Sequence, residues 1–543
     1  MPFSSVPESQ KTMCAIVAEK AESSPTQRFA VDVEGRSLNW ATLNDARLAW
    51  ADRFVELGIR KDDVVCTILD SGLQSLSLWL GLASIGGIDA SINSEFRGRM
   101  LAHALKTCQP SLIVCDAAYL PHLLAIADEL ESLPTVLSLG DHPDGSADAR
   151  VRTLATLPPA SGQSSDFLRC PQWHDIAAVT FTSGTTGPSK AVKLPWGQLN
   201  AINLGTFPID DMNDGDVFYC FTSHAHFGAK SIPYNAAMVG AQVLIRSRFS
   251  IKSFWPDITK FGVTTACLVG TMADMLMQDP ESPQGKTTLR NLFMAPLGPS
   301  YQKFADRYDL RIATVYNSTE NGVPICSGWR PDNARSIGRR REGYPGFEVR
   351  IVDEHDNEVP DGTPGECIVR SAVPWTMNAG YLNNPEATAV AWRNGWFHTG
   401  DALVRNPAGD YSFVDRLKDV IRRRGENISS FEVEADVKLN PDVAECAAIA
   451  VPADTTEDEI LLFVSKRPGS SLDAAGLCAE IETRMTRFMV PRYIEIIESF
   501  PKTQATERIL KTELRRRGLG PRTWDRQHRR YIGDPAAPEL AAP

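Results

Sequence analysis

Hydrophobic residues in this chain repeat with two different spacings, and segments of the two kinds alternate along the sequence. Some segments carry apolar residues every three or four positions, as amphipathic helices do, and others are short apolar runs typical of buried strands. The helical segments are residues 42–57, 73–85, 229–239 and 251–261, and the strand-like segments are 63–69, 111–115 and 242–246. Alternation of this kind predicts an α/β fold in which helices cover the faces of sheets.

The pattern changes twice toward the C-terminus, and these changes divide the chain. Residues 346–369 are strand-like and broken by turns, which predicts a small β-rich subdomain. Residues 415–428 are charged and contain glycine, and helical spacing restarts only after them, so we place a boundary at Lys418. We expect a large N-terminal domain of layered βαβ subdomains plus the β-rich part (1–417), a small α+β domain (418–520) and a partly disordered tail (521–543).

Composition narrows the class of protein. A chain of 543 residues exceeds the size of one hydrophobic core, and 43% apolar with 23% charged residues is ordinary for a globular protein. A net charge of −11 argues against nucleic-acid and anionic-membrane partners. Eleven cysteines without a Cys-x-x-Cys pair predict reduced thiols. No signal peptide or membrane span is predicted, so we expect a cytoplasmic protein whose partners are small molecules, with a homodimer as one option for its assembly.

Residues 180–190, Thr-Phe-Thr-Ser-Gly-Thr-Thr-Gly-Pro-Ser-Lys, form a loop suited to phosphate groups. Glycines and hydroxyl residues let N–H and O–H groups approach phosphate oxygens, and Lys190 offsets their charge. Strand-like residues lead into and out of the loop, and no helix follows it as in a Walker A motif. The pattern predicts nucleotide chemistry; a surface turn rich in Ser, Thr and Gly is the alternative.

Four segments, in order, resemble the motifs of the adenylate-forming superfamily of acyl-CoA ligases, peptide-synthetase adenylation domains and luciferases. They are the loop 182–190, the segment Tyr316-Asn317-Ser318-Thr319-Glu320, the segment 395–401 (Gly-Trp-Phe-His-Thr-Gly-Asp), and 415–419 with 425–428. The stretches 422–434 and 488–493 look most like the branch that contains crotonobetaine/carnitine–CoA ligases. The resemblance covers roughly residues 10–530. It implies an AMP-binding domain joined to a mobile C-terminal lid.

The resemblance also implies substrates and site residues. ATP, Mg²⁺ and CoA are expected, with Lys190 and Glu320 as catalytic residues and Glu320 as the metal ligand. Asp401 is suited to the two ribose hydroxyls, since a carboxylate has two acceptor oxygens, and Tyr316 offers an aromatic face to adenine. The further nucleotide-binding candidates are Thr182, Ser183, Gly184, Thr185, Thr186, Gly187, Ala295, Pro296, Asn317, Ser318, Thr319 and Arg416.

In the superfamily the small domain rotates about a hinge between two half-reactions. Lys418 matches the hinge position, and Gly425 matches the glycine beside which the pantetheine of CoA passes. Arg422, Arg423 and Arg424 could meet the phosphates of CoA, although a run of charges is also typical of a solvated face.

The chain departs from the superfamily where the adenylation lysine is expected. Residues 501–511 carry Arg508 at the best-matching position, and Lys511 is a less favoured substitute. Arginine keeps the charge but is a planar fork, so the two are not equivalent. We expect Arg508 to be catalytic; the alternative is an ordinary surface residue.

The substrate side also differs. We expect His224 to be catalytic and His226, Lys230 and Met294 to line the substrate pocket, although one histidine could instead be a core residue. A fatty-acyl tunnel would leave such polar groups unpaired at about 1–3 kcal/mol each. A short polar or aromatic acid is therefore predicted.

These inferences favour an ATP-dependent ligase that adenylates a small polar or aromatic carboxylic acid and transfers the acyl group to CoA, releasing AMP and pyrophosphate. One alternative is a diazotase that activates nitrite and diazotises an aromatic amine. Another is a non-catalytic nucleotide sensor, against which the retention of Lys190, Glu320 and Asp401 argues. The motifs alone do not exclude a luciferase-like oxygenase.

Overall fold

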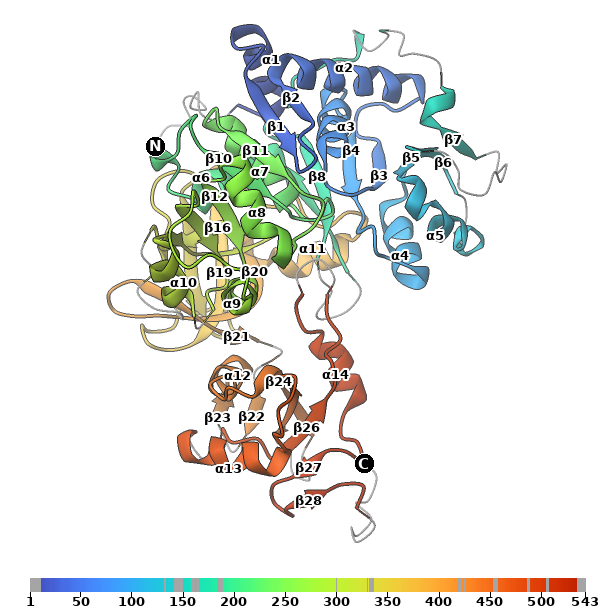
Figure 1. Cartoon of the computed structure of the whole chain (residues 1–543). Helices are drawn as coiled ribbons and strands as arrows, with labels where there is room; N and C mark the ends of the chain where they lie inside the picture. The colour runs from blue at the N-terminus through green and yellow to red at the C-terminus, as the bar shows by residue number, and fades with distance from the viewer. Residues whose placement is uncertain are drawn as a thin grey trace.

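The computed structural model shows a large N-terminal part and a smaller C-terminal domain joined near residue 418 (Figure 1). The predicted mixed α/β architecture is confirmed. The residues that the structure describes are 11–130, 133–140, 150–157, 162, 166–182, 189–298, 300–329, 331, 336–417, 419, 421–423, 426–452, 458–485, 489–503 and 507–534.

The first sheet holds the phosphate-loop hairpin. Its seven strands run in the order β7-β6-β5-β3-β4-β8-β9, and all neighbours are parallel except β8 and β9. Its strands are β3 (Val64–Ile68), β4 (Ile88–Ser91), β5 (Leu112–Cys115), β6 (Thr135–Ser138), β7 (Val151–Thr153), β8 (Ile176–Phe181) and β9 (Ala191–Pro195). The helices of this region are α2 (Trp40–Glu56), α3 (Leu73–Ser84), α4 (Gly98–Cys108) and α5 (Leu120–Leu124), with short turns η2 (Ala117–Tyr119), η3 (Ala127–Glu129) and η4 (Leu154–Thr156).

The second sheet has the order β14-β13-β12-β10-β11-β1-β2 and is parallel except for the β1–β2 pair. Its strands are β1 (Arg28–Asp32), β2 (Ser37–Asn39), β10 (Val217–Cys220), β11 (Gln242–Ile245), β12 (Thr265–Leu268), β13 (Asn291–Met294) and β14 (Arg311–Ala313). The helices here are α1 (Met13–Ser23), α6 (Trp196–Thr206), α7 (Gly228–Met238), α8 (Ile251–Phe261), α9 (Gly270–Gln278) and α10 (Tyr301–Tyr308), with the turn η6 (Ile209–Asp211).

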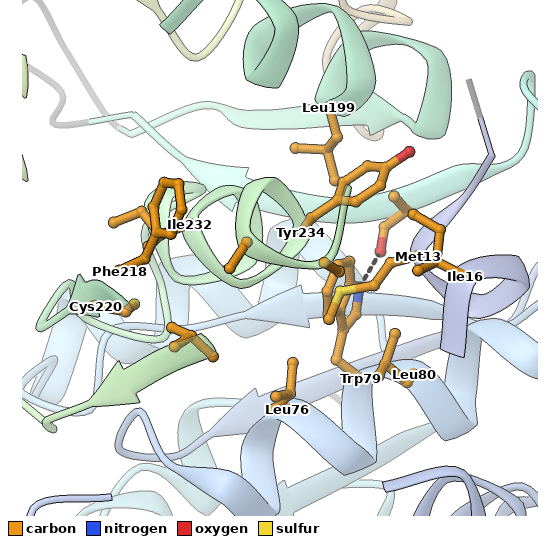
Figure 2. Close-up of a cluster of buried hydrophobic side chains, with 14 of the residues drawn as sticks. Met13, Ile16, Leu76, Trp79, Leu80, Leu199, Phe218, Cys220, Ile232 and Tyr234 are labelled. Carbon is orange, nitrogen blue, oxygen red and sulfur yellow. Dashed lines mark hydrogen bonds between the residues drawn. The ribbon is translucent and has the colours of Figure 1, made fainter. Parts of the chain in front are cut away.

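One hydrophobic core joins these two sheets. It contains residues from strands of both sheets and from helices α3, α6 and α7, as Figure 2 shows for Leu76, Leu199 and Phe218. The indoles of Trp79 and Trp196 stack at 5.2 Å between ring centroids. Because each helix buries an apolar face against a sheet, the two sheets are held at a fixed distance.

A third, antiparallel sheet follows, as the turn-rich pattern predicts. Its order is β15-β16-β17-β21-β20-β19-β18, and its strands are β15 (Val315–Ser318), β16 (Gly322–Cys326), β17 (Ser336–Arg340), β18 (Phe347–Val352), β19 (Gly365–Ser371), β20 (Phe397–Arg405) and β21 (Asp410–Arg416). Helix α11 (Pro385–Ala391) and the turn η7 (Arg393–Gly395) lie between β19 and β20 in the sequence.

The C-terminal domain has a five-stranded sheet and a separate two-stranded ribbon, β22 (Ile421–Arg423) with β23 (Glu426–Ile428). The sheet strands are β24 (Val443–Pro452), β25 (Asp458–Lys466), β26 (Tyr493–Ile497), β27 (Trp524–Asp525) and β28 (Arg530–Tyr531), and the helices are α12 (Ser430–Val437), α13 (Ala474–Arg484) and α14 (Lys511–Arg517). Residues 524–531, expected to be part of a tail, instead belong to this sheet. Trp524 is buried in the domain core and pairs with Ile494.

Residues 501–503 and 507–510 form a projection that we call the finger. A β-bridge joins Lys502 to Ile509, and the amide of Leu510 donates to the carbonyl of Pro501 at 2.8 Å. The finger rises from the C-terminal domain toward the large domain, just before α14 (Figure 1). Across the described part of the chain, no helix has the length and apolar character needed to cross a bilayer.

Candidate active site

The phosphate loop connects β8 to β9, so it closes an antiparallel hairpin. At its base the amide of Thr182 donates to the carbonyl of Lys190 at 3.0 Å, and the amide of Lys190 donates to the hydroxyl of Thr182 at 3.4 Å. Both ends of the loop are thus fixed by the sheet. Five of the predicted loop residues lie outside the described residues: Ser183, Gly184, Thr185, Thr186 and Gly187.

Lys190 and Glu320 meet through Tyr381. The Lys190 ammonium lies 4.9 Å from the centre of the Tyr381 ring, and the Tyr381 hydroxyl donates to Glu320 Oε1 at 3.3 Å. A cation over an aromatic face and a phenol donating to a carboxylate are both favourable contacts. The structure therefore brings the two predicted catalytic residues together.

The backbone around Glu320 is held firmly. Asn378 Nδ2 donates to the Glu320 carbonyl at 2.8 Å, and Gln198 Nε2 donates to the Thr319 carbonyl at 2.8 Å. Burial raises the pKa of Glu320, while the charge of Arg416 opposes that shift. A half-buried carboxylate whose side chain meets a phenol at 3.3 Å fits a metal ligand, because a cation would stabilise its charge. Of the same motif, Asn317 and Ser318 are half-buried.

Asp401 lies beside Arg416 on adjacent strands. Arg416 Nε is 3.0 Å from Asp401 Oδ1, and the Tyr316 hydroxyl donates to Asp401 Oδ2 at 2.7 Å. Gly400 has a φ of 70°, a backbone conformation that glycine adopts without strain, and its amide donates to Glu366 at 3.0 Å. These contacts orient the Asp401 carboxylate toward Arg416.

Tyr316 has a different environment from the one expected. The ring is 6% exposed and packs in the core of the third sheet, and its hydroxyl bonds to Asp401. A ring so covered has little surface for stacking on adenine. Its contact with Asp401 makes it a positioning residue for that carboxylate.

Arg508, on the finger, is coupled electrostatically to Asp401 and Arg416. The side chain is exposed, yet desolvation by the surrounding atoms and the charge of Arg416 lower its pKa, while Asp401 opposes this. Its positive charge also acts on His226 of the large domain. The charge of Arg508 is therefore coupled to residues of both the nucleotide side and the predicted substrate side. Lys511 differs, because its ammonium pairs with Glu434 at 2.7 Å within the C-terminal domain.

We call Lys190, Glu320, Tyr381, Asp401 and Arg416 the candidate nucleotide site. The charges of Asp401 and Glu320 both raise the pKa of Arg416, against the effect of burial, so the two carboxylates share this guanidinium as a neighbour. In the part of the chain that the structure describes, no three or more His, Cys, Asp or Glu side chains cluster as a metal site. A cation held by one protein carboxylate would thus need ligands from the nucleotide.

A second group of polar residues is buried between the first and second sheets. Lys230 of α7 is 1% exposed, and its ammonium lies 3.0 Å from Asp89 Oδ2 of β4. It also donates to Ser91 Oγ at 2.5 Å and to the His224 carbonyl at 2.8 Å. His224 Nε2 and Thr67 Oγ1 are 3.0 Å apart. We call these five residues the Asp89 cluster.

The Asp89 cluster corrects the expectation for Lys230. Its charge already has a carboxylate partner, so it supplies no argument for a charged substrate. Burial lowers the pKa of Lys230, while Asp89 raises it. His224 likewise lies in this cluster and apart from the candidate nucleotide site, so it has no contact that would support catalysis there.

The other residues predicted near the substrate differ in how exposed they are. Met294 is 0% exposed in the core of the second sheet, so it cannot line a pocket. Ala295 is half-buried and Pro296 is exposed just after it. His226 is half-buried, its Nδ1 accepts from the Gly228 amide at 3.0 Å, and desolvation, Arg508 and Lys230 lower its pKa to about 4.

A small cavity borders the Asp89 cluster. Its volume is about 10 Å³, close to the space for one water. The lining residues are Ser71, Gly72, Ser75, Leu76, Trp79, Cys220, His224, Ala229, Lys230 and Ile245.

The predicted CoA side is only partly described. Lys418 and Gly425 lie outside the described residues. Arg423 is 2% exposed, and its Nε lies 2.7 Å from Glu459. That pairing within the domain corrects the suggestion that Arg423 meets the phosphates of CoA.

Sequence reasoning missed Tyr381, Gln198, Asn378 and Asp89. None lies in a motif that we singled out, and each acts through a partner far away in the sequence. The one available signal was Asp89 itself, a carboxylate near the end of the apolar stretch of residues 73–92.

Comparison with known proteins agrees with this geometry. The family model described as AMP-binding enzyme matches residues 17–382, and the model for the AMP-binding enzyme C-terminal domain matches residues 432–506. The chain therefore belongs to the AMP-binding enzyme family, the adenylate-forming superfamily that the motifs resemble. More narrowly, it is an AMP-forming ligase of the acyl-CoA synthetase type.

A crotonobetaine/carnitine–CoA ligase of Salmonella arizonae is 31% identical over 496 residues, which cover 89% of this chain and 94% of that protein. ATP-bound MatB from Rhodopseudomonas palustris superposes with a TM-score of 0.80 at 22% identity, over 93% of this chain and 98% of MatB. The anthranilate CoA ligase AuaEII, in complex with anthranoyl-AMP, gives a TM-score of 0.80 at 19% identity, over 93% and 97%. The two structures show the shared fold.

Proposed function

We propose that this enzyme adenylates a small carboxylic acid with ATP and then transfers the acyl group to CoA. The observation that carries the proposal is the convergence of three distant segments. The phosphate-loop hairpin supplies Lys190, the third sheet supplies Glu320, Asp401 and Arg416, and the C-terminal finger supplies Arg508.

Each of these residues has a proposed role toward ATP. The loop 182–190 and Lys190 would hold the outer phosphates, and Thr319 would bond a phosphate oxygen. Asp401 would accept the ribose hydroxyls with lone pairs that remain beside its bonds to Tyr316 and Arg416. Ala295, Pro296 and Asn317 would border the base. Glu320 would hold Mg²⁺, which supplies positive charge for the departing pyrophosphate.

In the first step, a carboxylate oxygen of the acid attacks the α-phosphorus of ATP. The bond between the α-phosphorus and the bridging oxygen breaks, and pyrophosphate leaves with the electron pair. Arg508 would stabilise negative charge on the α-phosphate and orient the acid, because a guanidinium can donate two parallel hydrogen bonds. In the second step, the thiolate of CoA attacks the acyl carbon, and AMP leaves.

The proposed second step needs a different surface of the C-terminal domain at the acyl group. We propose rotation about Lys418, which would withdraw the finger and bring Gly425 beside the pantetheine. The contacts that this rotation would break include a hydrogen bond of 2.8 Å from the Arg467 side chain to Gln278. CoA as the acceptor is supported by the printed names of the relatives, which are CoA ligases.

The test is pyrophosphate release from Mg-ATP with short aliphatic acids and aromatic acids, each with and without CoA. Adenylation predicts release with the acid alone and AMP plus a thioester when CoA is added. Release that requires nitrite and an arylamine would replace the proposal with diazotisation. No release with any acid, despite ATP binding, would replace it with a nucleotide sensor.

A further inference from the structure

Strand β20 is irregular at residues 399–401, where its pairing with β19 shifts. The regular pairs on either side are Glu366–Ala402 and Ile368–His398. Cys367 is thus the one residue of β19 that lies opposite residues 399–401, which form a bulge in β20. Asp401 itself still pairs with Arg416 of β21. A bulge turns side chains to a new direction, and it takes backbone N–H groups away from their usual partners on the neighbouring strand.

Side-chain hydrogen bonds replace the lost pairing at this bulge. Thr399 Oγ1 donates to the Cys367 carbonyl at 2.7 Å and accepts from the Asp401 amide at 3.1 Å. The amide of Gly400 donates to Glu366 Oε1 at 3.0 Å. Glu366 therefore holds the backbone of the bulge at the residue next to Asp401.

The Glu366 carboxylate is itself fixed by two other side chains. Its Oε2 lies 2.9 Å from His398 Nδ1 and 3.1 Å from Arg393 Nη2. A carboxylate only accepts hydrogen bonds, so His398 Nδ1 carries a proton and donates it. The His398 side chain is 3% exposed, so the ring has little room to move. With two donors on Oε2, the other oxygen is directed to the Gly400 amide.

The two ends of Asp401 are thus held by different residues. At the carboxylate, the Tyr316 hydroxyl donates to Oδ2 at 2.7 Å and Arg416 Nε lies 3.0 Å from Oδ1. At the backbone, Glu366 acts through Gly400. Because a shift of the backbone moves the carboxylate, the direction of the Asp401 side chain depends on the bulge as well as on these two partners.

We infer that Glu366 is a positioning residue for ribose recognition: its hydrogen bond to the Gly400 amide sets the bulge that aims the Asp401 carboxylate at the ribose hydroxyls of ATP. The inference rests on the proposed role of Asp401 and deepens it, because Glu366 lies outside the candidate nucleotide site. The alternative is a glutamate that only stabilises the third sheet.

The first experiment measures, by isothermal titration calorimetry, how tightly each variant binds Mg-ATP and Mg-2′,3′-dideoxy-ATP, which lacks both ribose hydroxyls. We expect the wild-type enzyme to bind ATP about tenfold or more tightly, since hydrogen bonds to a charged group are lost with the hydroxyls. Glu366→Leu and Glu366→Ala lack the acceptor, and their ratio should fall below about threefold. Glu366→Gln keeps an acceptor oxygen for the Gly400 amide and should keep most of the preference.

Glu348→Leu is the matched control, because Glu348 pairs with Arg370 at 2.8 Å on the same sheet. It should keep the wild-type ratio. Each ratio is measured on one preparation, so it does not depend on the fraction of folded protein. An unchanged ratio in both Glu366→Leu and Glu366→Ala overturns the inference, as does an equal loss in Glu366→Gln or in Glu348→Leu.

The wild-type enzyme separates this inference from the proposed function. A wild-type ratio below about threefold overturns the inference, because there is then no ribose contact to position. Pyrophosphate release is measured separately with the acids named above. Its absence with every acid overturns adenylation, whereas the binding ratios still decide the role of Glu366.

The second experiment asks whether Glu366 acts through Asp401. We expect Glu366→Leu to weaken ATP binding by about tenfold in the wild-type background. In the Asp401→Ala background the same substitution should change ATP binding by less than about twofold, because the side chain that Glu366 positions is absent. Equal weakening in the two backgrounds overturns the inference, since a purely structural role of Glu366 would not depend on Asp401.

Discussion

The candidate nucleotide site and the Asp89 cluster each contain a lysine near a carboxylate, yet their bonding differs. Among the described contacts, the Lys190 ammonium lies over the ring of Tyr381, whereas the Lys230 ammonium has three oxygens within 3.0 Å. The two residues are both lysines, so their type does not distinguish their roles. They differ in how many hydrogen-bond acceptors already surround the ammonium group. A cation with its protons already committed supports the fold, and one without such partners can meet a ligand.

The comparison predicts its largest effect for Lys230. Lys230→Met leaves Asp89 charged and buried without its cation, and we expect the free energy of unfolding to fall by about 3–5 kcal/mol. Urea denaturation followed by tryptophan fluorescence measures this. The double variant D89N/K230M removes both charges and should recover part of the loss. If Lys230→Met were as stable as the wild-type enzyme, the ion pair would not contribute to the stability of the fold.

For Lys190 the effect should fall on activity. Lys190→Met removes a cation proposed to meet phosphate, so we expect adenylation to slow by about 10²–10³-fold, or about 2.7–4 kcal/mol of transition-state stabilisation. The free energy of unfolding should change by less than about 0.5 kcal/mol. Pyrophosphate release and urea denaturation of the same preparation measure the two quantities. Full activity in this variant would remove Lys190 from the mechanism.

Arg508 tests whether the finger belongs to the first step alone. Arg508→Ala should lower the rate of adenylation by about 10²-fold, and Arg508→Lys should recover only part of it, since the charge is restored without the two parallel N–H donors of the guanidinium. Thioester formation from a supplied acyl adenylate should change less than threefold. Arg516→Ala is the matched control, because Arg516 is exposed on α14 and pairs with Glu513. Equal loss in both half-reactions would argue against a finger that withdraws.

Local features of this molecule could be predicted from the sequence. The helix and strand periods were sound, as α7 (Gly228–Met238) and β11 (Gln242–Ile245) show, and motif order correctly suggested that Lys190, Glu320 and Asp401 lie together. Periodicity reports which side of an element is buried, but not what covers it. The ion pair between Lys230 and Asp89 could therefore not be predicted from the sequence, since it depends on how two sheets pack.

The strands of residues 524–531 were missed for a related reason. The segment is short and rich in arginine, so its composition resembles a solvated tail. Two residues per strand give no measurable alternation, and pairing with β26 becomes visible only when the sheet exists. Trp524 was the single sign, because a large aromatic side chain is rarely left in a tail.

The smallest effect that the comparison predicts is a pH dependence from His226, whose pKa is affected by both Arg508 and Lys230. Its pKa is lowered to about 4 in the folded chain, from an ordinary value of 6.5, first by desolvation and then by Arg508 and Lys230. Between pH 6.5 and about 4 the unfolded chain binds a proton that the folded chain does not. The free energy of unfolding therefore falls as the pH drops through this window and is unaffected by His226 above it.

From pH 7 to pH 5 this loss amounts to about 2 kcal/mol for His226. His226→Asn should remove that part of the slope, which urea denaturation at pH 5, 6 and 7 measures. His224 contributes in the same direction and remains in the variant, because its pKa is also lowered. Asp89 does not contribute here, since a carboxyl with a lowered pKa loses its contribution only below its ordinary pKa. Parallel pH profiles for His226→Asn and the wild-type enzyme would mean that His226 titrates as an ordinary histidine, and that Arg508 does not reach the substrate side.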